Sequence, residues 1–178
     1  MFDKQIVFTG KHADYLRKLA KGSSSEGAEW VFQYNYEVLL IAPLIGFLYN
    51  RTAETEKNTD VKENNIFLEA INRIRNDLEF TYRLLMILHK KKEFSVDERL
   101  NRAFRYDRDD EKRKSGDEVF WGYLLGGIEV LYEKFVDESH GSDELVQNIY
   151  EFIETFQMTK VNDFDQDAVI KLCQQAGI

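Results

Sequence analysis

The sequence predicts an all-α fold: a single-domain bundle of six or seven helices around a buried central helix. Apolar residues recur at helical spacing in several long segments. The composition, with one proline and many Leu, Ile, Glu and Lys residues, also favours helices. The segment Trp30–Tyr49 is apolar on nearly all sides, which is typical of a helix buried in a core or a membrane. Because 178 residues suit one domain, we assign residues 1–178 to a single helical domain.

The expected central helix spans Trp30–Tyr49 and contains features that indicate close packing. Its uninterrupted apolar run, Val38–Tyr49, is too short to span a bilayer, so we expect no membrane association. Pro43 lacks an N–H and is expected to kink the helix. Ala42 and Gly46 lie on one side and would let another helix approach closely. The main apolar face is expected to comprise Trp30, Tyr34, Val38, Ile41, Ile45 and Leu48.

The segments flanking this helix alternate between helices and polar breaks. Residues 1–8 are short and mixed, and a first helix should run from Thr9 or Gly10 to Leu19. The serines of Gly22–Gly27 suit the N-cap of the central helix. Arg51–Lys62 is a polar connector that we expect to be solvated, and a long helix should follow over Glu63–His89. The apolar stripe of that long helix is Phe67, Ile71, Ile74, Leu78, Leu85 and Leu88.

The second half of the chain has four further helical segments. Ser95 with Glu98 forms a capping-box pattern at the start of a short helix. The next helix should span about Asp117–Val136, and Gly126 and Gly127 in its middle are expected to pack against the Ala42 and Gly46 side of the central helix. A helix beginning near residues 143–144 and a short one beginning near residue 165 complete the bundle. The buried stripe of the Asp117–Val136 helix is Phe120, Leu124, Ile128, Leu131 and Phe135.

Composition and charge limit the classes of function. The net charge is −8 and the pI about 5.0, so the molecule as a whole should repel nucleic acid and anionic membranes. The lone Cys173 cannot form an internal disulfide, which fits a reducing compartment. The N-terminal residues show no apolar signal-peptide core. We therefore expect a cytoplasmic protein.

No motif predicts a metal, a cofactor or a catalytic nucleophile. Asp163, Asp165 and Asp167 alternate as in a calcium loop, but Ala168 and Gln174 stand where the loop needs Gly and Glu. The three histidines, His12, His89 and His140, have no second His or Cys at metal-ligand spacing. We expect no metal, no cofactor and no catalytic residue.

The strongest local anomaly is the segment Arg99–Lys114, which is basic within an acidic chain. Seven Lys and Arg residues against four Asp and Glu residues give +3, so the remainder of the chain carries −11. Guanidinium groups at this spacing can bind phosphates or carboxylates, and a tyrosine can stack on a base. The alternative is a solvated helix whose charges pair with one another, such as Arg105 with Asp109. The candidate partner-binding residues are Arg99, Arg102, Arg105, Tyr106 and Arg108.

A second candidate lies at the end of the Glu63–His89 helix. Arg83 is followed by His89 after five intervening residues, a pattern that resembles the motif of the HEPN ribonuclease family. The resemblance covers seven residues and departs from the family at Leu84, where a polar residue is usual. It implies an RNA-cleaving dimer in which His assists proton transfer and Arg stabilises phosphate charge.

These observations favour a non-catalytic intracellular accessory or regulatory protein that acts by binding a protein partner. The first alternative is a nucleic-acid-binding protein that uses the Arg99–Lys114 patch, and the second is a HEPN-like ribonuclease. The sequence leaves the partner and a homo-oligomeric state open.

Overall fold

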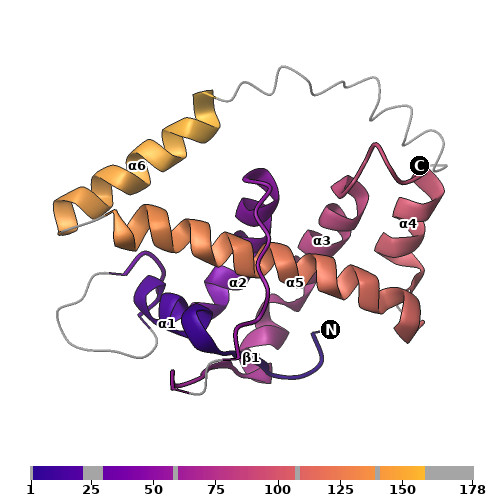
Figure 1. Cartoon of the computed structure of the whole chain (residues 1–178), viewed down its shortest axis with the longest axis horizontal. Helices are drawn as coiled ribbons and strands as arrows, with labels where there is room; N and C mark the ends of the chain where they lie inside the picture. The colour runs from indigo at the N-terminus through magenta and orange to yellow at the C-terminus, as the bar shows by residue number, and fades with distance from the viewer. Residues whose placement is uncertain (1, 22–29, 58–59, 107–108, 139–140, 159–178) are drawn as a thin grey trace.

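The computed structural model describes residues 2–21, 30–57, 60–106, 109–138 and 141–158. These residues form six α-helices and a small two-stranded sheet, which confirms the predicted all-α bundle (Figure 1). The elements in chain order are β1 (Ile6–Phe8), α1 (Gly10–Leu19), α2 (Asn35–Leu48), β2 (Asn64–Ile66), α3 (Leu68–Leu88), α4 (Val96–Phe104), α5 (Asp110–Tyr132), the π-helical turn η2 (Glu133–Asp137) and α6 (Ser142–Met158).

The core of the bundle is the contact between α2 and α5, which cross in the middle of the molecule (Figure 1). A Cβ atom at Gly46 would overlap the carbonyl oxygen of Tyr123, and one at Gly127 would overlap the carbonyl oxygen of Ala42. The predicted pairing of the small residues of α2 with the glycines of α5 is thus confirmed for Gly127, but not for Gly126. The two backbones can lie this close because neither glycine has a side chain at the contact.

The central helix is shorter and less completely buried than expected. It begins at Asn35 rather than Trp30, with the Tyr34 N–H donating to Glu37 Oε2 at 3.1 Å. Ile45 is 5% exposed, but Ile41 is 40% exposed and Leu48 is also exposed. The expectation of burial on all sides is therefore wrong, because α1, α3 and α5 cover only part of α2. The buried residues of α2 are Val38, Leu39, Ala42, Pro43, Ile45 and Gly46.

A strand stands where the long helix was expected to begin. Asn64–Ile66 pairs antiparallel with Ile6–Phe8. The side chain of Asn64 is buried, and its Oδ1 accepts a hydrogen bond from Asn35 Nδ2 at 3.2 Å. The helix α3 starts only after this pairing ends, at Leu68. Phe67, expected in the buried stripe, is consequently exposed at the junction.

The polar connector after α2 packs along α5 and is not simply solvated. The Ala53 N–H donates to the carbonyl oxygen of Gly122 at 3.0 Å. The Trp121 indole N–H donates to Thr55 Oγ1, also at 3.0 Å. A Cβ atom at Gly126 would overlap the backbone of Arg51, so this glycine admits the connector rather than α2.

The helix α5 starts before the expected position. It begins at Asp110, because Asp109 caps it by accepting from the Lys112 N–H at 3.2 Å, and it continues through Gly116. The predicted cap at Ser95 is confirmed, since its hydroxyl accepts from the Glu98 N–H at 3.2 Å. All five residues predicted for the buried stripe of α5 and η2 are buried.

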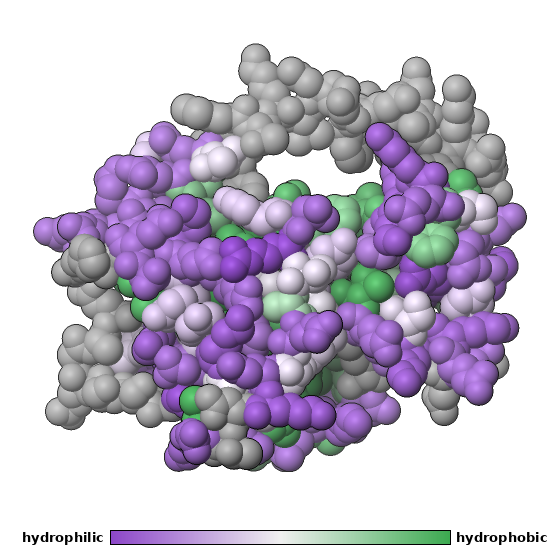
Figure 2. Space-filling model, viewed as in Figure 1, coloured by the Kyte–Doolittle hydropathy of each residue, from purple (hydrophilic) through white to green (hydrophobic). Residues whose placement is uncertain are grey.

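The surface is mostly polar, and Figure 2 shows small separate hydrophobic areas among hydrophilic side chains on the face viewed. Within the ranges that the structure describes, no helix is long and apolar enough to cross a membrane. The expected break at Gly22–Gly27, the aspartates from Asp163 to Asp167 and the expected last helix lie outside the described residues.

Candidate binding surfaces

The first two arginines of the predicted binding stretch point inward from α4. Arg99 donates from an NH group to the carbonyl oxygen of Ile87 at 3.0 Å, in the last turn of α3, where a cation complements the helix dipole. Arg102 is only 6% exposed. Its guanidinium lies 4.8 Å from the Phe94 ring centroid and donates to Ser115 Oγ at 3.3 Å. Both side chains join elements of the bundle, so they do not form one exposed stripe with Arg105.

Arg105 and Tyr106 of that stretch lie nearer the surface. Arg105 is exposed and donates to Asn101 Oδ1 at 2.9 Å, so the expected pair with Asp109 does not form. Instead, Asp109 pairs with Lys112 at 3.2 Å. The Tyr106 hydroxyl donates to Glu98 at 2.8 Å, and this carboxylate raises the pKa of Tyr106. Arg108 lies outside the described residues.

Arg83 and His89 of the HEPN-like motif line different hollows. Arg83 pairs with Glu79 at 3.3 Å and borders a cavity at the N-terminal end of the chain. His89 ends α3, and its Nδ1 lies 3.0 Å from the Tyr123 hydroxyl in a shallow groove beside α5. Burial, together with the charges of Arg102 and Lys90, lowers the pKa of His89. The fold therefore does not bring the two side chains into one cavity.

An ionic cluster around the buried Glu129, which the sequence analysis missed, joins α1 to α5. Glu129 accepts from Lys11 at 2.8 Å and lies 3.2 Å from His12 Nε2, and Arg51 binds both Glu129 and Glu133. Burial lowers the pKa of His12. Burial alone would raise the pKa of Glu129, but the hydrogen bond and charge of Lys11, with those of Arg51, lower it on balance. The sequence signal for this cluster was Glu129, a glutamate within the apolar part of α5. Because the charged groups of the cluster pair with one another, the cluster has a structural role.

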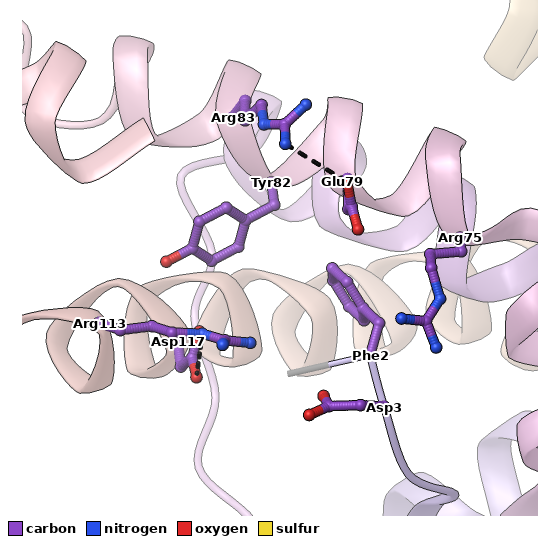
Figure 3. Close-up of a pocket in the computed structure, with 8 residues that line it drawn as sticks. All are labelled: Phe2, Asp3, Arg75, Glu79, Tyr82, Arg83, Arg113 and Asp117. Carbon is purple, nitrogen blue, oxygen red and sulfur yellow. Dashed lines mark hydrogen bonds and ion pairs between the residues drawn. The ribbon is translucent and has the colours of Figure 1, made fainter. Parts of the chain in front are cut away.

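A cavity of about 270 Å³ lies between the first residues of the chain, α3 and α5 (Figure 3). It is lined by Phe2, Asp3, Arg75, Glu79, Tyr82, Arg83, Arg113 and Asp117. Figure 3 shows Arg75 and Arg113 on opposite sides of Phe2, with both guanidinium groups directed toward it. The sequence did not indicate this cavity, because its residues come from three segments without a shared motif.

The outer face of α6 exposes large apolar side chains. Val146 is 66% exposed, Tyr150 57% and Ile153 49%, and their spacing of four and three places them on one side of the helix. The adjacent apolar side packs inward, where Phe152 contacts Phe135 edge to face and stacks on Tyr49. Every charged residue in Ser142–Met158 is acidic: Asp143, Glu144, Glu151 and Glu154. The sequence predicts a helix here but does not indicate which of its apolar sides is exposed.

Comparison with known proteins adds no assignment: no family model, no curated protein and no solved structure matches this chain.

Proposed function

We propose that this chain is a non-catalytic intracellular accessory or regulatory protein that binds a partner protein through the outer face of α6. The observation that carries the proposal is the exposed apolar row of Val146, Tyr150 and Ile153. Apolar side chains scattered singly over a surface are ordinary, but a contiguous row along one helix is typical of an interaction site. The single Cys173 supports the intracellular part of the proposal.

Burial of this row would supply a useful part of a binding free energy. Each large apolar side chain contributes about 1.5–3 kcal/mol when it is fully buried. Association costs several kcal/mol in lost motion, so the row serves as the centre of a larger interface rather than as the whole of it. A helix of the partner protein can lie along α6 and present its own apolar residues at the same spacing.

The charges around the row favour a basic amphipathic helix as the partner. Asp143 and Glu154 project, by helical spacing, beside the apolar row, and α6 contains no cation. A second copy of α6 would bring acidic residues against acidic residues and would be repelled. A partner helix with Leu or Ile along its centre and Lys or Arg along its edge matches both properties.

The direct test uses a synthetic helical peptide of leucine and lysine as the probe. The protein should bind this peptide in a titration followed by fluorescence anisotropy, and a leucine–glutamate peptide of the same pattern should not bind. The double variant Val146→Ser/Ile153→Ser should weaken binding at least tenfold without loss of helical circular dichroism. Phe80→Ser, at an equally exposed position on α3, is the matched control and should bind normally.

Equal binding by the Val146→Ser/Ile153→Ser variant would refute α6 as the site. Co-purification from the host identifies the natural partner. We expect this partner to be lost from Val146→Ser/Ile153→Ser and to be retained by Phe80→Ser.

A second candidate is the binding of nucleic acid at the basic end formed by α4 and the start of α5. Arg105 is exposed there and donates to the neutral Asn101 side chain, and no carboxylate of the described residues forms an ion pair with it. Affinity for single-stranded RNA should fall linearly with the logarithm of salt concentration, and Arg105→Glu should reduce it. Absence of binding at low salt would eliminate this candidate.

The HEPN-like alternative requires Arg83 and His89 to act at one phosphate, which their separate hollows do not favour. Incubation of the purified protein with RNA tests it. Turnover that is lost in both Arg83→Ala and His89→Ala would support a ribonuclease.

A further inference from the structure

The cavity at the N-terminal end has an apolar wall and a small volume. Phe2 and Tyr82 are both buried, and Phe2 packs edge to face on Phe120 with the ring centroids 5.6 Å apart. The space of about 270 Å³ lies just below the range of drug-sized pockets, roughly 300–1,000 Å³. Its occupant would therefore be a small molecule with a modest apolar part.

Two arginines that face the cavity have hydrogen-bonding capacity to spare. Arg75 donates to Asn72 Oδ1 at 2.7 Å, the one side-chain hydrogen bond that its guanidinium makes with the described residues. Arg113 approaches the Asp117 carboxylate through Nε at 3.6 Å, a long contact for an ion pair. Arg83 is paired with Glu79 and is the less available third cation. Arg75 and Arg113, which reach the cavity from opposite sides of Phe2, thus each have N–H groups left to donate to a ligand carboxylate.

The same cavity has an acceptor that lacks a donor. Asp117 Oδ1 is buried and has no hydrogen-bond partner among the described residues, while the carboxyl group as a whole, on a side chain that is 31% exposed, interacts with Arg113 and the Tyr82 hydroxyl. Burial raises the pKa of Asp117, and the nearby charge of Asp3 raises it further. An unsatisfied buried oxygen is costly, and a cationic donor would satisfy it. A positive group beside Asp117 would also relieve the repulsion between the two carboxylates.

We infer that this cavity binds a small zwitterion of the α-amino acid class. The ligand's carboxylate accepts from Arg75 beside Phe2, and its ammonium group donates to Asp117 with Asp3 nearby. The lining carries three carboxylates and three guanidinium groups, so an anion alone or a cation alone would meet like charges, and a molecule with both charges complements it. A short apolar side chain fits against Phe2 and Tyr82. This inference does not depend on the proposed role of α6.

Three probes that share the isobutyl unit test the charge requirement. L-Valine carries both charges, isovalerate lacks the ammonium group and isobutylamine lacks the carboxylate. Isothermal titration of the full chain should show binding of L-valine, with isovalerate and isobutylamine at least tenfold weaker. Binding of isovalerate as tight as that of L-valine would overturn the zwitterion assignment in favour of a simple anion site.

Isosteric and conservative variants locate the site. Asp117→Asn and Arg75→Gln should each weaken L-valine binding at least tenfold, while Lys112→Gln, an exposed change on the same helix, should leave it unchanged. Thermal unfolding of each variant verifies folding. If Asp117→Asn does not fold, Arg75→Gln remains decisive, because Arg75 is only half-buried and contacts a side chain of its own helix. No binding of L-valine to the folded wild-type chain, or unchanged binding by folded Arg75→Gln, would refute the inference.

Discussion

Replacement of Gly127 by alanine tests the contact that organises the fold. Two effects oppose each other in this variant. Alanine is favoured over glycine inside a helix by about 1 kcal/mol. Against this, the new methyl group would overlap the carbonyl oxygen of Ala42 and lie 2.9 Å from the amide nitrogen of Gly46. Both obstacles are backbone atoms of α2, which cannot move away as a side chain can.

The clash should outweigh the propensity gain. Overpacking of a core usually costs about 1–3 kcal/mol, and more where a backbone must shift, so we expect a net loss of about 2 kcal/mol or more. Urea unfolding followed by far-UV circular dichroism measures this loss. For a chain of this length, each kcal/mol corresponds to roughly 2–4 °C in Tm.

Gly122→Ala is the matched control on the same helix. A Cβ atom there would meet Thr52 Cβ at 3.5 Å, an ordinary van der Waals distance. This variant should be neutral or gain up to about 1 kcal/mol. If Gly127→Ala were as stable as Gly122→Ala, the inference that α2 and α5 pack backbone to backbone would be wrong.

Three further outcomes are expected. Ile45→Ala should cost about 2–5 kcal/mol in urea unfolding, whereas Ile41→Ala, at a 40% exposed position, should cost less than about 1 kcal/mol. Burial lowers the pKa of His12 in the folded state, so the unfolded chain takes up a proton on this imidazole at a higher pH than the folded chain does. The free energy of unfolding should therefore decrease as the pH falls below about 6.5, and His12→Gln should flatten this part of its pH dependence. Arg102→Met removes a buried charge that has no carboxylate partner among the described residues. Its free energy of unfolding should lie within about 1 kcal/mol of the wild-type value. A loss above about 3 kcal/mol would indicate that the contacts of Arg102 with Ser115 and Phe94 contribute more to stability than we infer.

Local patterns in the sequence determined most of the helices. The period of the apolar residues predicted α1, α3, α5 and α6, since one covered face is enough to stabilise a helix in a bundle. The hydroxyl of Ser95 capped α4 as predicted, because a cap depends only on residues within one turn. Small residues in two distant helices even indicated the contact of Gly46 with Gly127, since close backbones require the absence of side chains on both sides.

The tertiary structure alone decided which surfaces are covered. Asn64–Ile66 is a strand because Ile6–Phe8 lies beside it, and no local pattern encodes such a distant pairing. Arg102 is buried because Phe94 and Ser115 receive its guanidinium, although its spacing suggested exposure. Likewise, the cavity between Arg75 and Arg113 exists only where α3, α5 and the first residues meet. A sequence states which side chains are apolar or charged, but burial depends on the elements that pack against them.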